Sequence, residues 1–289
     1  MPELPEVETI RRGLQELIVG KMIEIVSFDT AKSFPNNRSD VNQFLVNAKI
    51  KSIRRRAKVL LIDLSTNYTL VIHLKMTGQL VFVNNMARFG AGHPNDSLIG
   101  VLPDKSTRVT FDLADGSHLY FNDQRKFGWV RLIPTAEVPN INFMKKVGPE
   151  PLEADFTASE FTERFKRRSK TTIKAALLDQ TVVAGIGNIY ADESLWGAKI
   201  NPKRLVNTIT NAEFKRLYKE VRLVMNLSIE KGGSTNRNYV NAEGKKGSYM
   251  DFARVFRREG LACTRCGTEI IKLKVTGRGT HICPNCQRI

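Results

Sequence analysis

Cysteine is absent from the first 262 residues of this 289-residue chain, and all four cysteines lie in the last 27 residues. A disulfide framework spread through the fold is therefore excluded, and metal binding is the better expectation for the cysteines. The sequence also has no run of 18 apolar residues, and its first ten residues contain no basic residue. These absences argue against a membrane span and a secretory signal, so we expect a soluble intracellular protein.

The charge of the chain points to a polyanionic partner. Lys and Arg number 45 against 29 Asp and Glu, which gives a formal net charge of +16. Nucleic acid is the commonest partner of such a basic protein, although charge alone does not separate DNA from RNA or a membrane surface. A hydrophobic fraction of 42% excludes wholesale disorder, and the length accommodates two domains.

Hydrophobic periodicity changes along the chain. Residues 6–20 have apolar side chains at helical spacing and end at Gly20, which predicts a helix. Residues 22–133 form short alternating runs with an Asp115-Gly116 hairpin signal, which predicts an antiparallel sheet with a less ordered stretch over 85–100. Helical patterns dominate after residue 153. We therefore predict an α+β protein.

Four prolines in residues 134–152 indicate a linker between the sheet and the helices. The Gly-, Asn- and Ser-rich stretch 232–252 predicts a long functional loop. The expected organisation is a sheet domain over 1–133, a linker over 134–152, a helical domain over 153–244 and a zinc finger over 245–289.

The four cysteines form two pairs with the spacing of a zinc site. They are Cys263, Cys266, Cys283 and Cys286. Four thiolates fill a tetrahedral Zn²⁺ and leave no position for water, so the zinc should be structural. Between the pairs, apolar and basic residues alternate toward a Gly277-Arg278-Gly279 tip. Arg278 is either an ordinary solvated turn residue or a phosphate contact, and the basic bias of this end favours phosphate.

Two other segments have the features of phosphate contacts, each with an ordinary alternative. The turn over 185–187 leads into a helix through Asn188, where free backbone amides suit a phosphate. A dinucleotide motif is excluded there, because Tyr190 stands where its third glycine belongs. Lys58 follows a run of arginines at the entrance of an apolar strand; a solvated face is the alternative.

The first residues suggest a catalytic amine. Pro5, Glu6 and Glu8 make a good helix start, but they leave Pro2 and Glu3 unexplained. Removal of the initiator methionine would expose the secondary amine of Pro2 next to the positive end of that helix. Attack of this amine on a sugar C1′ would give an iminium, and Glu3 could protonate the ring oxygen.

Together these segments resemble the formamidopyrimidine-DNA glycosylase family, base-excision enzymes for oxidised purines. The match covers nearly the whole chain in order. It includes PELPEVETIRRGL, RRRAKVLL, HLKMTGQL, FNDQRKFGW, VGPEPL, GIGNIYADESL, GGST and the four-cysteine end. Leu4 is informative, because the sister branch that removes oxidised pyrimidines typically has glycine at this position.

The resemblance implies an N-terminal antiparallel β-sandwich flanked by helices, a helical domain with a helix-two-turn-helix motif, and a zinc-finger hairpin. It further implies a bifunctional glycosylase and abasic-site lyase that acts through a Schiff base on Pro2 and β,δ-elimination. The partner would be double-stranded DNA with an oxidised purine or an abasic site. A monomeric, cytoplasmic, nucleoid-associated bacterial protein is expected.

The family motifs also imply a role for each matching residue. Pro2 would be the nucleophile and Glu3 the general acid, with Lys58 as a catalytic lysine near the lesion phosphate. The implied phosphate contacts are His73, Lys58, Asn188 and Arg278, and the residues implied to fill the void left by the flipped nucleotide are Met76, Arg125 and Phe127. For Met76 and Phe127, burial in the sheet core is the alternative.

Three positions depart from the family pattern. Lys75 and Arg257 stand where glycine is frequent, and Asn236 replaces an aliphatic residue of the lesion loop. Two rival functions also stay open: an oxidised-pyrimidine glycosylase on the same scaffold, and a non-enzymatic zinc-containing DNA-binding protein.

Overall fold

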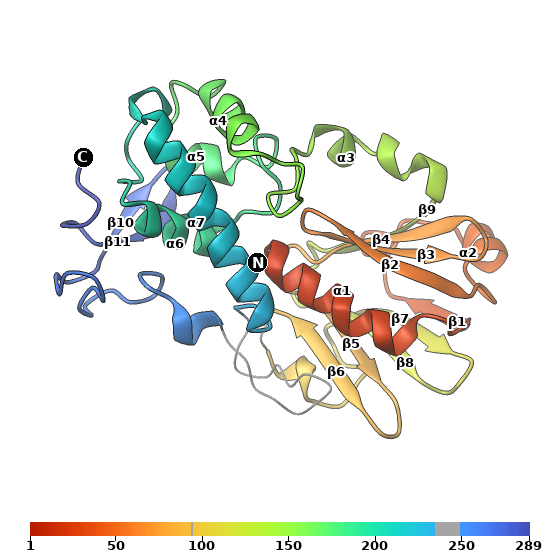
Figure 1. Cartoon of the computed structure of the whole chain (residues 1–289). Coiled ribbons are helices and arrows are strands. Elements are labelled where there is room, and N and C mark those ends of the chain that lie inside the picture. Colours follow the sequence, from red (N-terminus) through yellow and green to blue (C-terminus); the bar gives the residue numbers. More distant parts are fainter. Residues whose placement is uncertain (94, 235–248) are drawn as a thin grey trace. The chain divides into compact units, whose positions relative to one another are not determined.

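The computed structural model describes residues 1–93, 95–234 and 249–289 and divides into two compact units (Figure 1). The sheet unit comprises Met1–Lys145 and the segment that starts at Lys231. The helical unit comprises Lys146–Glu230 and Tyr249–Ile289. Within the described ranges, no helix is long and apolar enough to cross a membrane.

Two antiparallel sheets form the sheet unit. One has the strand order β1-β7-β8-β5-β6 and the other β2-β3-β4-β9. The strands are β1 (Ile23–Phe28), β2 (Ile50–Arg56), β3 (Val59–Leu64), β4 (Tyr68–His73), β5 (Gly78–Val83), β6 (Arg88–Gly92), β7 (Thr107–Leu113), β8 (His118–Asp123) and β9 (Trp129–Pro134). This arrangement confirms the expected antiparallel β-sandwich.

The core of the sheet unit follows the two-residue period of its strands. Leu60 and Ile62 of β3 join Phe82 and Phe121 of the other sheet in one buried cluster. Val59 and Leu61 face the opposite side, under η2 (Thr135–Asn140) and α3 (Asn142–Lys146). Alternation along β3 therefore sends neighbouring residues into two separate apolar layers.

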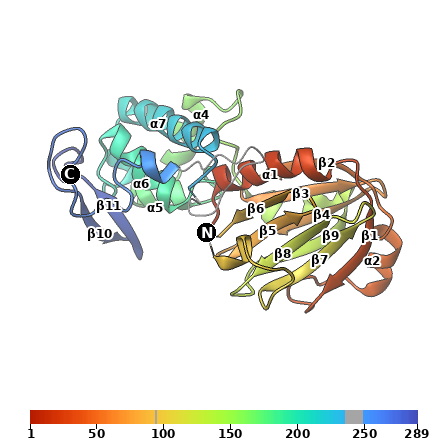
Figure 2. The same ribbon diagram turned by 90° about the horizontal axis from the view of Figure 1, so that it is seen from below.

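Helix α1 (Leu4–Ile18) covers one side of the sandwich, where it packs on the edge strands β2 and β6 (Figure 2). Its apolar stripe of Val7, Ile10, Leu14 and Ile18 is buried in the same core as the sheets. The Gln15 side chain accepts a 3.2 Å hydrogen bond from the Ile53 amide. The helix thus satisfies part of an edge that would otherwise invite pairing with another chain. A second helix, α2 (Arg38–Phe44), follows β1.

The stretch 85–100 is more regular than its composition suggests. It contains β6 and the 3₁₀ helix η1 (Asp96–Leu98), so the expectation of low order is wrong. Strand β6 reads RFGAG and has no β-branched residue, and its order comes from pairing with β5. The proposed linker contains all of η2 and α3, and the domain boundaries stay a prediction. Most of the predicted loop, including Asn236, lies outside the described residues.

Helices and one hairpin form the helical unit. They are α4 (Ala158–Lys166), α5 (Ile173–Leu178), α6 (Asn188–Ala198), η3 (Val206–Thr208), α7 (Asn211–Glu230), η4 (Tyr249–Phe252), β10 (Ile271–Val275) and β11 (Arg278–Ile282). Helix α7 buries Phe214, Leu217, Val221 and Val224 at helical spacing. Threonine side chains cap the N-termini of α4 and α5. The predicted helices after residue 153 are therefore present.

Candidate active site and nucleic-acid interface

Pro2 and Glu3 are buried at the N-terminus of α1. Glu3 is the N-cap residue and forms a capping box with Glu6, whose Oε2 accepts a 2.7 Å hydrogen bond from the Glu3 amide. The other oxygen of Glu6 accepts a 2.8 Å bond from the Ser234 amide. Glu6 therefore fixes the backbone beside Pro2 and the start of the loop, a role that sequence reasoning missed because it treated Glu6 only as a helix-start residue.

The start of the chain lies near His93, just after β6. Burial and the N-terminal ammonium lower the pKa of His93, whereas Asp123 raises it. A Cβ on Gly92 would lie 2.4 Å from the carbonyl oxygen of Gly78, so the end of β6 touches the start of β5. The start of the chain is therefore at the sandwich end where β5 begins.

Lys58 and His73 lie at neighbouring strand ends. Lys58 is 5% exposed in the β2–β3 turn, and the next residue, Val59, pairs with His73. Burial, followed by the charges of Lys75 and Lys58, lowers the pKa of His73 to about 3. The Nδ1 atom of His73 accepts a 3.0 Å bond from the Lys75 amide. The neutral imidazole must then carry its proton on Nε2, which makes that atom a hydrogen-bond donor.

Two of the residues that depart from the family pattern, Lys75 and Arg257, have a left-handed backbone conformation. Lys75 has φ of 51° and Arg257 has φ of 58°, both in the left-handed region. Glycine adopts this conformation freely, whereas for another residue it costs about 1–2 kcal/mol of conformational free energy. The frequent glycine at both family positions therefore has a steric reason, and this chain tolerates the strain.

Met76 and Phe127 are on the surface, which excludes burial in the sheet core for both. Met76 is 38% exposed in the β4–β5 turn, and Phe127 is 46% exposed in the β8–β9 turn. The Arg125 guanidinium lies over the Phe127 ring at 4.8 Å from its centroid. The β4–β5 turn ends beside the start of the β8–β9 turn, because Gly78 pairs with Asp123. Two apolar groups and a guanidinium thus project from one end of the sandwich.

The helical unit brings Asn188 to the zinc-finger hairpin. Asn188 is the first residue of α6, and its Nδ2 donates a 3.0 Å bond to the Gly279 carbonyl. Val275 pairs with Arg278, and Thr276 and Gly277 have φ of 47° and 78°. The expected tip is therefore wrong by one residue, since Thr276 and Gly277 form the turn. Arg278 is the exposed first residue of β11, next to the carbonyl that Asn188 binds.

A buried charge network holds this hairpin on the helices. The Lys174 Nζ lies 2.6 Å from both the Asp192 Oδ1 and the Thr280 Oγ1, and Lys174 and Asp192 are fully buried. Asp192 Oδ2 also accepts a 2.9 Å bond from the His281 amide. No spacing rule identifies these residues in the sequence, because a single lysine on a helix is usually solvated.

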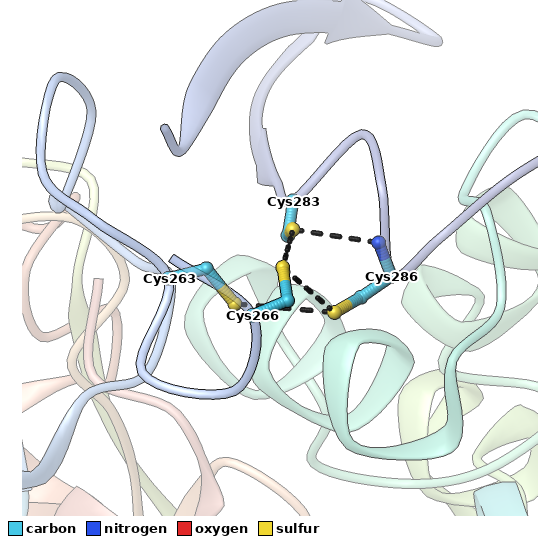
Figure 3. A group of neighbouring side chains, drawn as sticks. All are labelled: Cys263, Cys266, Cys283 and Cys286. Carbon is cyan, nitrogen blue, oxygen red and sulfur yellow. Dashed lines mark hydrogen bonds between the residues drawn. The ribbon is translucent and has the colours of Figure 1, made fainter. Parts of the chain in front are cut away.

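The four cysteines converge on one point (Figure 3). All four sulfurs lie within 4.8 Å of one another, and none of the four cysteines forms a disulfide. Three S–S distances are 3.4, 3.5 and 4.0 Å, close to the separation of about 3.8 Å that a tetrahedron with Zn–S bonds of about 2.3 Å requires. The donor set therefore fits one structural zinc.

The zinc site is joined to the helices by Gln287. Its Oε1 accepts a 3.0 Å bond from the Cys283 amide, and its Nε2 donates a 3.0 Å bond to the Ile200 carbonyl. Cys263 and Cys283 also pack against Trp196 of α6. The metal site therefore stabilises the hairpin and its attachment to the helices.

A β-sandwich with a buried Pro2, a helical unit and a four-cysteine hairpin together define a class of two-unit zinc-finger proteins. Three family models match in order: the "Formamidopyrimidine-DNA glycosylase N-terminal domain" over residues 1–130, the "Formamidopyrimidine-DNA glycosylase H2TH domain" over 147–240 and the "Zinc finger found in FPG and IleRS" over 260–289. The chain belongs to the formamidopyrimidine-DNA glycosylase family.

Full-length relatives agree with this assignment. The chain is 43% identical over 290 residues to the formamidopyrimidine-DNA glycosylase of Pelotomaculum thermopropionicum and 42% identical over 289 residues to that of Streptococcus mutans. Each match covers 100% of both chains.

Solved structures with similar folds contain damaged DNA. A mutant Lactococcus lactis FPG bound to Fapy-dG DNA has a TM-score of 0.87 and 36% identity, with 100% of both chains covered. The Lactococcus lactis Fpg with abasic-site DNA has a TM-score of 0.86 and 36% identity, with 99% of this chain and 100% of that chain covered. The expected family, α+β architecture and zinc are confirmed, and the roles of individual site residues stay predictions.

Proposed function

We propose that this protein is a bifunctional DNA glycosylase and abasic-site lyase that removes oxidised purines, 8-oxoguanine and formamidopyrimidines, from double-stranded DNA. Its relatives are named formamidopyrimidine-DNA glycosylases, and similar solved structures contain Fapy-dG or abasic-site DNA. The observation that carries the mechanism is the buried Pro2 directly before the Glu3 cap of α1. A non-enzymatic DNA-binding protein would not need this arrangement.

The proposed nucleophile is the nitrogen of Pro2 after loss of Met1. A primary α-amine is roughly 10% unprotonated at pH 7, against roughly 0.04% for lysine. The secondary amine of proline is more basic, and the positive end of α1 offsets this by disfavouring the ammonium form. A retained Met1 would convert the Pro2 nitrogen into an amide and abolish the reaction.

The reaction proceeds in two stages. The Pro2 nitrogen bonds to C1′ and loses its proton, the bond from C1′ to the damaged base breaks, and the base leaves with the bonding electrons and takes up a proton in exchange. Glu3 protonates the ring oxygen as the sugar opens to a charged iminium. The iminium then withdraws electrons while a C2′ proton is lost and the 3′ phosphate leaves. Loss of the C4′ proton from the resulting conjugated iminium then expels the 5′ phosphate. Water finally hydrolyses the product from Pro2.

Other site residues hold the substrate in this proposal. Lys58 and the neutral His73 contact lesion phosphates, the lysine through its charge and the histidine through Nε2–H. Asn188 and Arg278 provide a second phosphate contact, supported by the bond between Asn188 and Gly279. The void-filling group is Met76, Arg125 and Phe127, whose exposed apolar surfaces and guanidinium can replace a flipped nucleotide.

Borohydride trapping tests the covalent step. Wild type incubated with an abasic-site duplex should yield an adduct at Pro2, and the mass of the protein should lack Met1. Pro2→Glu, in which the large second residue retains Met1, should yield no adduct. Full trapping of a variant with a blocked N-terminus would refute the mechanism.

The acid role of Glu3 has a matched control on the same helix. Glu3→Gln should lower excision by about 10²–10⁴-fold, whereas exposed Glu16→Gln should match wild type. Excision should be faster from 8-oxoguanine:C than from thymine-glycol duplexes. The reverse order would favour the oxidised-pyrimidine alternative.

The site of action follows from the substrate. We propose that the protein works as a monomer on cytoplasmic DNA in association with the nucleoid. Light scattering of the purified protein and imaging of a C-terminal fluorescent fusion test this; a stable dimer or exclusion from the nucleoid would contradict it.

A further inference from the structure

Asp123 joins the two turns that carry the void-filling residues. It is the last residue of β8 and is completely buried. Its Oδ1 accepts hydrogen bonds from the Thr77 hydroxyl and, at 3.2 Å, from the Arg125 amide. Its Oδ2 accepts a 2.6 Å bond from the Gly128 amide. One carboxylate therefore binds the β4–β5 turn and both ends of the β8–β9 turn.

Thr77 completes the connection between these turns. Its hydroxyl donates to Asp123 and accepts a 3.1 Å bond from the Arg125 amide. Thr77 is 6% exposed and directly follows Met76. Met76 is thus connected, through Thr77, to the backbone of Arg125 on the neighbouring strand turn.

The surroundings keep this carboxylate in place. A Cβ on Gly128 would lie 3.1 Å from the Asp123 Oδ2 and 3.0 Å from the His73 carbonyl oxygen, so the site requires a residue without a side chain. The Asp123 carbonyl accepts a 2.9 Å bond from Arg108 Nε, and Arg108 is paired with Asp29 at 2.6 Å. Both the side chain and the backbone of Asp123 are therefore anchored.

Both turns contain a strained residue. Lys75 has φ of 51° and Lys126 has φ of 54°. Non-glycine residues persist in this region only where surrounding contacts over-determine the backbone. Buried bonds to Asp123 and Thr77 supply such contacts, whereas the side chains of Met76 and Phe127 remain exposed.

We infer that Asp123 and Thr77 are positioning residues that hold Met76, Arg125 and Phe127 as one preorganised wedge. This inference rests on the proposed function. Two independent mobile turns would each lose conformational freedom on entering the base stack, and this loss would weaken binding in the inserted state. A shared buried anchor removes most of that loss before DNA binds. The wedge should therefore matter where a duplex must be opened and the vacated space filled.

Thr77→Val tests the inference with little change of volume. The valine removes the donor to Asp123 and the acceptor for Arg125, while Thr77→Ser retains the hydroxyl as a matched control. The full-length zinc-loaded proteins are compared on an 8-oxoguanine:C duplex and on an abasic site in a single-stranded oligonucleotide, which has no stacked gap to fill. A 2-aminopurine beside the lesion reports wedge insertion.

Thr77→Val should slow single-turnover excision from the duplex by about ten- to a hundredfold, the effect of removing a buried hydroxyl and leaving its hydrogen-bond partners without it. It should reduce the 2-aminopurine signal and leave single-strand cleavage within about twofold of wild type. Thr77→Ser should match wild type within about twofold. Adding Thr77→Val to Phe127→Ala should slow excision little further, because both act on one unit.

If Thr77→Val lowers the rate of duplex excision and the rate of single-strand cleavage by the same factor, the inference is overturned in favour of a purely structural role. Wild-type behaviour of Thr77→Val would overturn it as well. If Thr77→Val does not fold, Asp123→Asn decides between the same outcomes. The asparagine amide has the shape of the carboxylate, but its NH2 group would face one of the O–H or N–H donors that Asp123 binds. Failure of wild type to form a borohydride adduct would instead reject the proposed function.

Discussion

Replacing Lys174 with methionine should destabilise the helical unit by about 3–5 kcal/mol. The Lys174 ammonium is fully buried between the Asp192 carboxylate and the Thr280 hydroxyl. Methionine fills a similar volume but leaves Asp192 charged and buried, with the His281 amide as its main remaining donor. Because domains of this size are stable by only about 5–15 kcal/mol, the loss would be a large share of the total.

Urea unfolding of the zinc-loaded protein measures this change. The chain has two tryptophans, Trp129 and Trp196. In a Trp129→Phe background, the fluorescence of Trp196 reports the helical unit, since Trp196 packs beside the zinc cysteines. Lys219→Met removes an exposed lysine of α7 and should shift the midpoint very little.

The double variant Lys174→Met with Asp192→Asn identifies the cause. It should regain much of the lost stability, because no buried charge is left without a partner. A loss below about 1 kcal/mol in Lys174→Met would refute the argument from the buried ion pair. Since the same ammonium also lies 3.4 Å from the Gly279 carbonyl, Lys174→Met should also weaken binding to an abasic duplex under conditions where it is folded.

Three further predictions follow from the sheet unit and the zinc site. With its pKa lowered to about 3, His73 should stay neutral in the native protein. Between pH 6.5 and 3 only the unfolded chain takes up a proton at His73, so the free energy of unfolding should decrease as the pH falls through this range. NMR titration should show no protonation of His73 above pH 5. Gly13→Ala should lower the melting temperature, because its Cβ would lie 2.3 Å from the buried Phe89 ring; an increase, as helix propensity alone predicts, would contradict the packing. Chelation of the zinc should weaken DNA binding by releasing the hairpin that carries Arg278, and unchanged affinity of zinc-free protein would show that the hairpin makes no contact with DNA.

Local patterns predicted much of the fold because their physical cause is local. The stripe of α1, the alternation of the strands and the Asp115-Gly116 hairpin each depend on neighbours a few residues apart. The zinc site was equally predictable, since each cysteine pair forms one tight turn. Strand β6 was missed because its glycine-rich sequence becomes ordered only by pairing with β5.

The sequence by itself determined most of the elements, the zinc ligands and, through its family motifs, the candidate site residues. Only the tertiary structure decided how those residues are held. Asp123 binds Thr77 from 46 positions away, and Lys174 binds Thr280 from 106 positions away. Likewise, the low pKa of His73 arises from burial and from lysines on adjacent turns. Contacts of this kind depend on strand register and packing, and no spacing along the chain encodes them.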